Sequence, residues 1–539
     1  MARVAAIDIG SNAIRLRIVE VDPPVMGPDG PRFTPFRDIL VDRAPVRLGH
    51  DVFTKGRLEP GVIGAACEAL RRFRVAMDGA KVDRYRAVAT SAAREAANGD
   101  VFVERADREA GIHVEVIEGV EEARLVQLAV AERVHLAGRN AVLIDIGGGS
   151  TEITLLRGSA DGPRAATAVF ARSLPVGTVR LIEAFLEGRG PIDSAHRNLL
   201  DEYIDRVFVE AIPEIRTLSA GAVEQLVGTG GNIETLADLC PVPSAFPGGG
   251  RAIDVDAMRR FLDRLCEKGV DERVQLWNLR PDRADTIVPA ASVLCRLADA
   301  FGLTSIAAPG VGLKEGVLVD LARAHFVPQD FRGEALALTD ACLRLGRRYH
   351  FDEAHGVLVG RLGVKLFDEL GRHHRLGPRD RILLHAAALL HDVGDYVRYE
   401  GHHKHSYYLI ANSDLLGMTA AERAIVANVA RYHRKSAPQL DHEGFRALPP
   451  KDRGKVKSMA AILRVADALD REHRGKVTDV SARVDGEVLL LDVQGAGDRA
   501  LEEWTVFAKA GMLKDAFGLD VRFEGAGVRS TRSVPVVPT

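Results

Sequence analysis

Two short segments, more than a hundred residues apart, have the residue types of a phosphate-binding loop. Residues 6–12 read Ala-Ile-Asp-Ile-Gly-Ser-Asn, and residues 143–151 read Leu-Ile-Asp-Ile-Gly-Gly-Gly-Ser-Thr. In each segment an apolar run closes on Asp-x-Gly, which predicts a carboxylate at the end of a strand, followed by backbone N–H groups that an anion can approach closely. One such loop would fit an ordinary tight turn. Because the loop occurs twice, we predict that the two copies are two halves of one phosphate site.

A third glycine loop has the same setting. Residues 226–232, Leu-Val-Gly-Thr-Gly-Gly-Asn, follow an apolar strand and precede a helical segment at 233–239, so their N–H groups would also point at an anion. Three such loops predict a polyanionic ligand held across a cleft. The candidate phosphate-binding residues in these loops are Gly10, Ser11, Asn12, Gly147, Gly148, Gly149, Ser150, Gly228, Thr229, Gly230 and Gly231.

Further segments extend this pattern in a fixed order along the chain. They are residues 89–96 (Ala-Thr-Ser-Ala-Ala-Arg-Glu-Ala), 116–125, 173–181 and 312–316. With the loops, they make residues 1–320 similar to the exopolyphosphatase/guanosine pentaphosphate phosphohydrolase family. The resemblance implies a duplicated actin and sugar-kinase type α/β fold, which is ribonuclease H-like. Two positions depart from the usual pattern, since Lys314 stands where an arginine is common and Arg15 follows the first loop where members vary.

The resemblance also implies roles for individual residues. In the family, the first glutamate of the Glu-Glu-Ala-Arg segment orients the attacking water, and that position is Glu121 here. Arg94 lies in the family's arginine motif, where a guanidinium can pair bidentately with phosphate oxygens. Arg15 and Arg283 are weaker candidates for the same task, and a surface ion pair is the alternative for each.

The aspartates of the first two loops are candidate metal ligands. Asp8 and Asp145 end paired strands, where they could hold Mg²⁺, or Mn²⁺ as an alternative, directly or through water. Capping of the neighbouring N–H groups is the other role open to them. Glu118 and Glu122 are assigned structural or supporting roles.

Histidines gather in the second half of the chain, where 12 of the 17 lie between His350 and His473. The His391-Asp392 pair falls late on an amphipathic helix, and Asp467 lies on an otherwise apolar helix face where an unpaired carboxylate would be costly. Such a pattern resembles the metal ligands of HD-domain phosphohydrolases, although Asp395 replaces a lysine that often follows the pair. The candidate ligands of this second site are His355, His391, Asp392, His405, His433 and Asp467.

The histidine cluster has a competing interpretation. In long members of the family a related helical domain is often degenerate and forms a wall of the polyphosphate channel, without metal. His373, His374, His402 and His403 are expected to be solvated loop residues.

Periodicity along the chain predicts four domains. Strand-like and helix-like segments alternate over residues 1–130 and 131–320, which indicates two α/β domains of the actin type. Helical periodicity dominates residues 330–474, an all-α HD-like domain. Strand-like alternation around an Asp-Gly turn at 485–486, then a helix at 500–517 and a strand at 521–523, predicts a small α+β domain over 475–539.

Composition fits a large enzyme of the cytoplasm. The 539 residues exceed a single core, 46% of them are hydrophobic, and the net charge of −3 argues against nucleic-acid or membrane partners. Five scattered cysteines show no disulfide or zinc-finger spacing, as expected in a reducing compartment. The chain begins without a basic-then-apolar leader, so we expect a cytoplasmic protein. The resemblance implies a homodimer.

The motifs together predict an exopolyphosphatase that releases terminal orthophosphate from inorganic polyphosphate by Mg²⁺-assisted attack of water. Hydrolysis of guanosine pentaphosphate is the close alternative, and one protein could do both. A protein that binds polyphosphate or an alarmone without turnover is the third hypothesis. A basic segment of the helical domain could carry a long chain, and its residues are Arg431, Arg434, Lys435, Arg446, Lys451, Arg453, Lys455 and Lys457.

Overall fold

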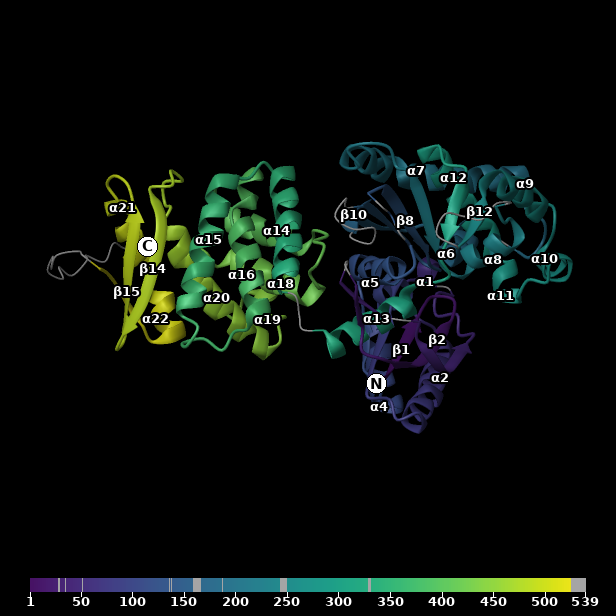
Figure 1. The fold of residues 1–539 in the computed structure, drawn as a ribbon, viewed down its shortest axis with the longest axis horizontal. Helices are drawn as coiled ribbons and strands as arrows, with labels where there is room; N and C mark the ends of the chain where they lie inside the picture. The colour runs from purple at the N-terminus through teal and green to yellow at the C-terminus, as the bar shows by residue number, and fades with distance from the viewer. Residues whose placement is uncertain are drawn as a thin grey trace. The chain divides into compact units, whose positions relative to one another are not determined.

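The computed structural model describes residues 1–524 except 28, 29, 34, 51, 135, 137, 159–165, 187, 243–249 and 328–330. It divides into two compact units, Met1–Gln329 and Asp330–Thr539, which are described separately (Figure 1). The finer division into four domains remains a prediction. Among the described residues, no helix combines the length and the apolar character needed to cross a membrane.

The first unit contains two sheets with the same strand order. In the first sheet the order is β5-β2-β1-β6-β7. Strand β2 runs antiparallel to β1 and pairs antiparallel with β5 on its other side, and β6 and β7 continue the sheet in parallel from β1. The strands are β1 (Ala2–Ile9), β2 (Ile14–Val21), β5 (Arg37–Ala44), β6 (Arg84–Ala89) and β7 (Val114–Val116). A separate two-stranded ribbon joins β3 (Val25–Gly27) to β4 (Gly30–Arg32).

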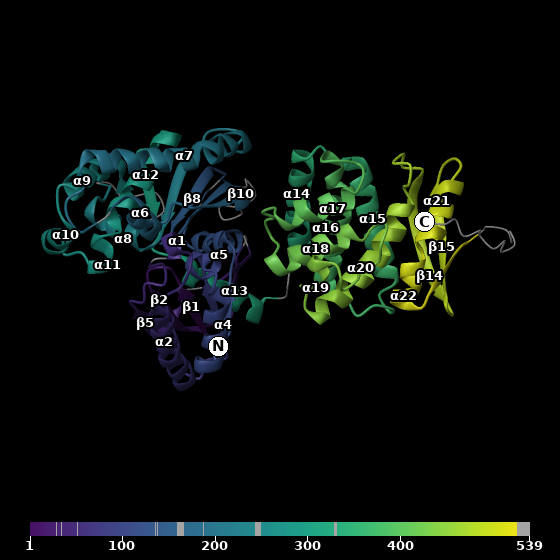
Figure 2. The same cartoon turned by 180° about the vertical axis from the view of Figure 1, so that it is seen from behind.

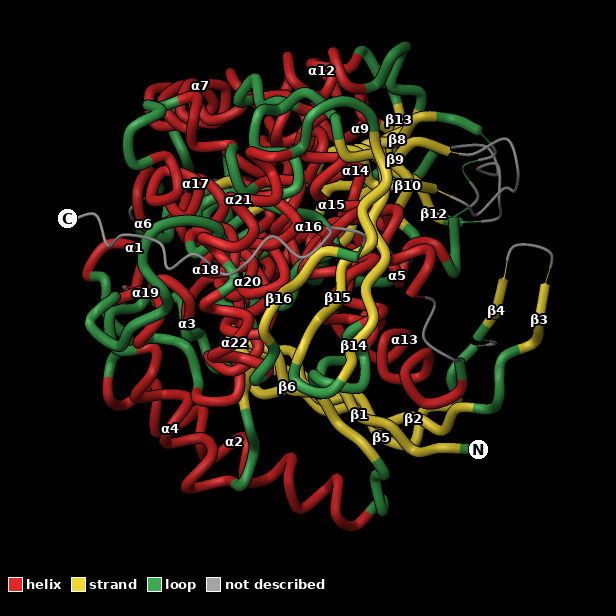
Figure 3. The backbone as a smooth tube through the Cα atoms, turned by 90° about the vertical axis from the view of Figure 1, so that its left-hand side faces the viewer, coloured by secondary structure: helices red, strands yellow, loops and turns green. Residues whose placement is uncertain are grey.

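The second sheet repeats this arrangement and adds one strand, in the order β10-β9-β8-β11-β13-β12. Its strands are β8 (Asn140–Ile146), β9 (Thr151–Gly158), β10 (Ala166–Leu174), β11 (Gln225–Thr229), β12 (Arg251–Asp254) and β13 (Ser305–Ala308). Strands β8 to β10 form an antiparallel meander, and β11 and β13 run parallel to β8. In Figure 3 the strands β8, β9 and β10 lie next to one another in yellow. The repeated order bears out the duplicated α/β architecture.

Helices cover both sheets, as buried strands require. They are α1 (Val52–Lys55), α2 (Pro60–Gly79), α3 (Ser91–Glu95), α4 (Gly99–Ala110), α5 (Gly119–Ala131), α6 (Thr178–Phe185), α7 (Ser194–Leu218), α8 (Gly231–Leu239), α9 (Val255–Cys266), α10 (Val270–Trp277), α11 (Pro281–Ala284), α12 (Ile287–Phe301) and α13 (Leu313–Phe326).

Two of these helices connect the two sheets. Helix α13 follows the second sheet in the chain, yet it packs against β1 and α5. A Cβ at Gly316 would lie 1.9 Å from the carbonyl oxygen of Leu125, so α13 can approach α5 this closely only with glycine there. Helix α5 in turn packs against β9 and β10. The predicted boundary at residue 320 therefore cuts through a helix that belongs with the first sheet.

The second unit begins as a bundle of helices and ends in a small sheet. Helices α15, α16, α18 and α20 pack on one another around a core that includes Leu362, Leu389 and Ile462. Figure 2 shows this bundle from behind, in green. Its elements are α14 (Phe331–Arg348), α15 (Glu353–Glu369), α16 (Pro378–Leu390), the 3-10 helix η1 (Val393–Tyr396), α17 (His402–Ala411), α18 (Ala420–Arg431), α19 (Glu443–Arg446) and α20 (Pro450–Ala468).

The C-terminal sheet has the order β14-β15-β16. Strands β14 (Val477–Asp485) and β15 (Val488–Gly495) form the predicted hairpin, and Gly486 in its turn has a φ of 60°. Strand β16 (Asp520–Phe523) adds in parallel to β15. The single helix expected at 500–517 is two helices, α21 (Ala500–Lys509) and α22 (Gly511–Phe517), and both pack on α20.

Candidate active site

The three glycine loops meet in one cleft of the first unit. A cavity of about 610 Å³ is lined by Gly10, Ser11 and Asn12 after β1, by Gly147 and Gly148 after β8, and by Gly230 and Gly231 before α8. The loops follow the carboxyl ends of β1, β8 and β11, which are interior strands at equivalent places of the two sheets. The structure therefore brings together most of the predicted phosphate-binding residues.

The first two loops lie in direct contact. The Oγ atoms of Ser11 and Ser91 are 3.1 Å apart. A Cβ at Gly148 would lie 2.8 Å from the Cβ of Ser11, and a Cβ at Gly149 would lie 2.2 Å from the ring of Phe53. Glycine at these positions allows the close approach of the two loops, beyond any role in binding an anion.

The remaining predicted loop residues support the cleft without lining it. Gly228 and Thr229 belong to β11, and Thr229 Oγ1 donates a 2.6 Å hydrogen bond to Asp145 Oδ1. Ser150 Oγ donates a 2.7 Å hydrogen bond to Glu152 Oε1. These two hydroxyls orient the carboxylates of Asp145, which lines the cleft, and of Glu152, which lies beside Asp145.

Asp8 and Asp145 both line the cleft and are buried. They occupy equivalent places in the two β-hairpins, since Asp8 pairs with Arg15 across β1 and β2 and Asp145 pairs with Glu152 across β8 and β9. Arg15 donates a 2.7 Å hydrogen bond to Asp8 and so neutralises it. The second hairpin has a glutamate at the equivalent place, so the duplicated sites differ in charge.

Three buried acids gather at this second hairpin. One carboxylate oxygen from each of Glu122, Asp145 and Glu152 lies within 4.8 Å of the others. Glu122 Oε2 and Glu152 Oε2 are buried and accept no hydrogen bond from the described residues. Such a set of unpaired oxygens is costly unless a cation or a proton joins them.

The proximity of the three acids shifts their titration. Burial and the Asp145 charge raise the pKa of Glu152 to about 7, and burial and the Asp8 charge raise the pKa of Asp145 to about 6. Burial, Glu152 and Asp145 raise the pKa of Glu122 well above its ordinary value. A raised pKa in a cleft is typical of a general base or of a group that awaits a cation.

Glu121 and Glu122 lie on different sides of helix α5. Glu122 lines the cleft. Glu121 instead accepts hydrogen bonds from Arg86 at 3.0 Å and from Arg124 at 2.7 Å, and Asp320 of α13 pairs with both arginines. Burial opposes ionisation of Glu121, but Arg124 and Arg86 outweigh it and hold its pKa below the ordinary value. Glu121 therefore belongs to an ion-pair network that joins α5 to α13, and Glu122 is the one of the two that lines the cleft.

The start of α5 is held tightly against β10, which fixes the position of Glu122. A Cβ at Gly119 would lie 2.2 Å from the Cβ of Ser173, so only glycine permits this approach. Ser173 Oγ also donates a 2.7 Å hydrogen bond to Glu152. The same strand thus positions two of the three acids.

Basic side chains also line the cleft, among them Arg15, Arg43, Arg280, Arg283 and Lys314. Burial and the nearby Arg15 charge lower the pKa of Arg283 to about 10, so this cation is poorly solvated. Poorly solvated guanidinium groups attract phosphate strongly. Arg94 is absent from the described lining; it donates a 2.7 Å hydrogen bond to the carbonyl of Ile117 and lies 3.9 Å from Glu122.

A second candidate site lies in the helical part of the other unit. His355, His391 and Asp467 come together there, and Asp392, His402 and His433 form an adjoining group. His402 occupies the place expected for His405, which belongs to none of these groups of described residues. His402, His403 and His374 are buried, so the expectation that they are solvated loop residues is wrong. The reason is that α17 begins at His402 and turns it inward against Asp392.

The chain has relatives among known proteins. Its sequence matches the Ppx/GppA phosphatase family over residues 30–325 and domain III of that family over residues 339–514. It is 25% identical over 442 residues to the guanosine-5'-triphosphate,3'-diphosphate pyrophosphatase of Photobacterium profundum, covering 81% of this chain and 82% of the relative.

Solved structures give a similar result for the first unit. An exopolyphosphatase from Cytophaga hutchinsonii is 27% identical with a TM-score of 0.52, covering 60% of this chain and 98% of that one. An exopolyphosphatase-like protein is 26% identical with a TM-score of 0.50, covering 60% of this chain and 100% of that one.

Proposed function

Since the chain belongs to the Ppx/GppA phosphatase family and is therefore a phosphoanhydride hydrolase, we propose that it is an exopolyphosphatase, releasing terminal orthophosphate from inorganic polyphosphate. The observation that carries the proposal is one cleft lined by three glycine loops, by several arginines and by Glu122, whose Oε2 accepts no hydrogen bond from the described residues. Such a site can hold a phosphate chain end and activate water beside it.

The loops and cations would bind the terminal phosphates. Gly10, Gly147 and Gly230 line the cavity, and the N–H groups of Gly10 and Gly147 hold their loops in shape by donating to the carbonyls of Ala13 and Ser150. Arg15 and Arg283 add side-chain donors that carry full positive charge. Preorganised donors of this kind stabilise the charge that spreads over the phosphoryl oxygens in the transition state. Arg94 does not bind the phosphates directly in this scheme, because it lies nearer to Glu122 than to the cavity.

Glu122 is the general base of the proposal. Its Oε2 accepts no hydrogen bond from the described residues, and burial together with Glu152 and Asp145 raises its pKa, which makes it a stronger proton acceptor than an ordinary carboxylate. Glu121 lacks both properties because Arg86 and Arg124 already bind it.

Asp145 and Glu152 would hold the divalent cation, for which we propose Mg²⁺ with Mn²⁺ as an alternative. The fit rests on the unpaired, buried Oε2 of Glu152 and on the hard oxygen donors that Mg²⁺ prefers. When bound, the cation neutralises charge on the phosphoryl group and the leaving phosphate. Asp8 is the weaker candidate ligand because Arg15 neutralises it.

Hydrolysis of guanosine pentaphosphate is the second candidate function, with the stringent-response role that such a substrate implies. It is favoured by the relative from Photobacterium profundum, whose similarity extends over 81% of this chain and so beyond the first unit. The cation-lined cleft suits a phosphate chain end of either substrate. Binding of either ligand without turnover is the third possibility, and the presence of Glu122 argues against it.

The test compares phosphate release from long-chain polyphosphate and from guanosine pentaphosphate, with Mg²⁺ and equal concentrations of terminal phosphate. We expect a higher kcat/KM for polyphosphate. A higher value for the nucleotide would replace the exopolyphosphatase proposal with the alternative. If neither substrate releases phosphate, only the third possibility, binding without turnover, remains.

Three further features complete the proposal. We propose an HD-like, metal-binding character for residues 330–474, supported by the convergence of His355, His391 and Asp467. Cytoplasmic location and a homodimer follow from the family resemblance, and light scattering of the purified protein would test the dimer. The predicted basic segment remains a candidate polyphosphate track, although its Lys455 is already paired with Asp380 at 2.7 Å.

A further inference from the structure

The helical unit brings together more histidines and aspartates than the single metal site outlined above requires. We propose that they form a centre for two divalent cations, bridged by Asp392, and that this centre is a second active site that hydrolyses phosphate monoesters. This function goes beyond phosphoanhydride hydrolysis in the first unit and does not depend on it.

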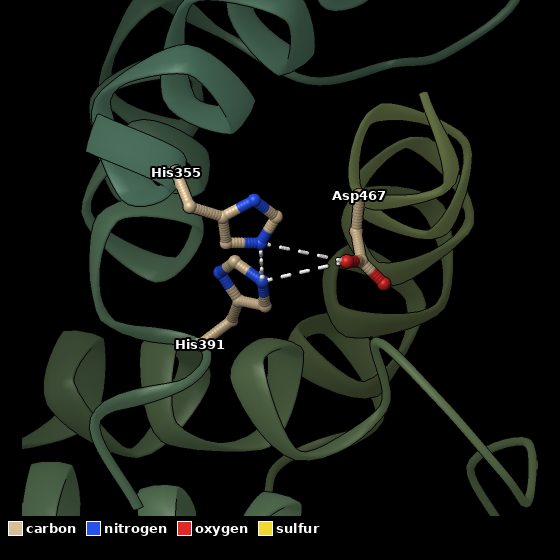
Figure 4. Close-up of side chains that lie close together, drawn as sticks. All are labelled: His355, His391 and Asp467. Carbon is tan, nitrogen blue, oxygen red and sulfur yellow. Dashed lines mark hydrogen bonds and ion pairs between the residues drawn. The ribbon is translucent and has the colours of Figure 1, made fainter. Parts of the chain in front are cut away.

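The first half of the centre comes from three helices. His355 lies in α15, His391 directly follows α16, and Asp467 lies in α20; Figure 4 shows their side chains pointing toward one another. The two Nε2 atoms are 3.2 Å apart, and Asp467 Oδ1 lies 3.7 Å and 3.6 Å from them. Asp392 Oδ2 lies 3.7 Å from His355 Nε2 and 3.5 Å from His391 Nε2.

These distances match a coordination sphere. Four ligand atoms each about 2.1 Å from a cation lie roughly 3.4 Å apart in a tetrahedron. The distances between the nitrogens and the carboxylate oxygens here scatter closely around that value. The four donors therefore surround a space of the right size for one ion.

The second half uses the other oxygen of Asp392. Oδ1 lies 3.1 Å from His402 Nε2 and 3.3 Å from His433 Nε2, and these two nitrogens are 3.2 Å apart. The oxygen is buried and accepts no hydrogen bond from the described residues. A carboxylate with one oxygen toward each group of histidines is placed as a bridge between two ions, and paired ions in hydrolases lie about 3.5–4 Å apart.

Hydrogen bonds at the far side of each imidazole favour the ligand tautomer. The Nδ1 atoms of His391 and His433 each lie 2.7 Å from a backbone carbonyl oxygen, of Ala388 and Ala430 respectively. A carbonyl oxygen can only accept, so Nδ1 carries the proton and Nε2 keeps its lone pair. The same orientation of metal-binding histidines by acceptors is common in metalloproteins.

The other two histidines are oriented by carboxylates. His355 Nδ1 lies 2.9 Å from Asp470 Oδ2, and His402 Nδ1 lies 2.5 Å from Asp395 Oδ1. In both Nε2···Nε2 contacts, at 3.2 Å, neutral rings with the proton on Nδ1 would bring two lone pairs face to face. A metal ion between them would turn this repulsion into coordination. Asp395, which stands where a lysine is expected, is thus the partner that orients His402.

The surroundings select an anionic substrate. A cavity of about 280 Å³ opens onto Asp392, His402, His433 and Asp467. The cavity is also lined by four cationic side chains, Arg434, Lys435, Arg471 and Lys509. A closed structural metal site would have no such opening. Lys509 pairs with Asp467, and the other three add positive charge beside the metal positions. This charge suits a phosphate dianion, which a monoester carries and a diester does not.

The reaction balances without a further reactant. The oxygen of a water bonds to phosphorus, and the phosphorus–oxygen ester bond breaks with its electron pair on the alcohol oxygen. The proton lost by the water ends on that oxygen, so the products are an alcohol and orthophosphate. Paired divalent cations lower the pKa of water and stabilise both the attacking and the leaving oxygen.

The test counts metal ions and measures ester hydrolysis in the full-length protein. Protein loaded with Mn²⁺ and freed of excess metal by gel filtration should contain two ions in the helical centre. To exclude ions and chemistry of the first cleft, all variants carry Glu122→Gln and Glu152→Gln. We expect hydrolysis of p-nitrophenyl phosphate to exceed that of bis(p-nitrophenyl) phosphate.

A matched pair of variants on one helix sharpens the test. His402→Gln should reduce the content to one ion and lower monoester hydrolysis about a hundredfold, whereas His405→Gln, three residues along α17, should change neither. Arg434→Ala should keep both ions and raise KM for the monoester, which a loss of folding would not produce. Thermal unfolding of each variant shows whether the bundle is intact.

Three results would overturn the inference: fewer than two ions in the centre, equal effects of His402→Gln and His405→Gln, or two ions without monoester hydrolysis. None of them bears on polyphosphate hydrolysis, which is measured separately in protein with an unaltered cleft. Failure of the second active site and failure of the proposed function are therefore distinguishable.

Discussion

Adjacent glutamates on helix α5 offer a pair of substitutions with opposite expected effects. Glu122→Gln removes the only proton acceptor that we assign to the reaction, and positioned general bases contribute about 10²- to 10⁴-fold to rate. We therefore expect kcat for phosphate release to fall by that factor, equivalent to about 3–5 kcal/mol in the activation barrier. Glu122 Oε2 accepts no hydrogen bond from the described residues, so the substitution loses only the 3.9 Å contact with Arg94, and relief of the three-acid cluster should leave stability equal or higher.

Glu121→Gln should instead lower stability and leave kcat nearly unchanged. The side chains of Glu121 and Arg86 are 13% and 16% exposed, and Arg124 is 34% exposed. Breaking a buried ion pair costs about 3–5 kcal/mol, which we lower to roughly 2–3 kcal/mol because Arg124 is partly solvated. We expect that loss in the free energy of unfolding, with kcat within about threefold of the wild type, since no proton-transfer group is removed.

The stability loss should depend on pH in a defined direction. Arg124 and Arg86 lower the pKa of Glu121 from its ordinary 4.5, so its contribution is present above pH 4.5. It disappears as the pH falls through the folded-state pKa, because both states then bind the proton. The difference between wild type and Glu121→Gln should therefore shrink in acid.

The assay combines steady-state phosphate release with urea unfolding for both variants, and equilibrium binding of polyphosphate confirms that each still takes up substrate. Reversal of the pattern, with Glu121→Gln inactive but stable and Glu122→Gln active, would refute the assignment of the base and restore the role first given to Glu121.

Two further outcomes follow from the cleft. Gly149→Ala places a Cβ 2.2 Å from Phe53, and overpacking of this kind costs about 1–3 kcal/mol. Both thermal stability and phosphate release should therefore fall. An active variant of unchanged stability would show that the loops are not held in contact. In EDTA, where no divalent cation is bound, the native state keeps a proton on Glu152 up to its raised pKa of about 7, whereas the unfolded state loses that proton near the ordinary 4.5. Stability should therefore decrease as the pH rises from 4.5 to 7. Glu152→Gln should flatten that decrease and Mg²⁺ should reverse it in the wild type; identical unfolding curves for the two proteins across this range would count against the cluster.

The duplication of the fold was readable from the sequence because it is local. Each Asp-x-Gly loop follows its strand directly, and both Asp8 and Asp145 line the cleft as that pattern predicts. Glu152 was missed, although it follows Asp145 at the spacing by which Arg15 follows Asp8. Comparison of the two hairpins residue by residue would have found it.

The choice between Glu121 and Glu122 depended on the rotation of one helix. The buried positions of α5 include Glu122, Leu125, Val126, Ala129 and Val130, which form one helical stripe. Reading that stripe would have pointed Glu122 inward. The family motif alone could not decide, because neighbouring residues on a helix face directions about 100° apart.

The histidine centre exposes a different limit. Both His402 and His405 could reach Asp392 from sequence spacing alone, and the start of α17 decides between them. That start depends on how η1 and α17 pack on each other, with Gly394 allowing close contact. Such tertiary packing leaves no local trace in the sequence.

The central claim is that the chain removes terminal phosphates from polyphosphate by attack of water in the cleft of the first unit. The most direct measurement follows orthophosphate and chain length together, in wild type and Glu122→Gln, with long-chain polyphosphate, Mg²⁺ and ¹⁸O-labelled water. We expect orthophosphate that carries the label from the start of the reaction, gradual shortening of the chains, and loss of both in Glu122→Gln. Rapid shortening without orthophosphate, or equal release by both proteins, would contradict the account.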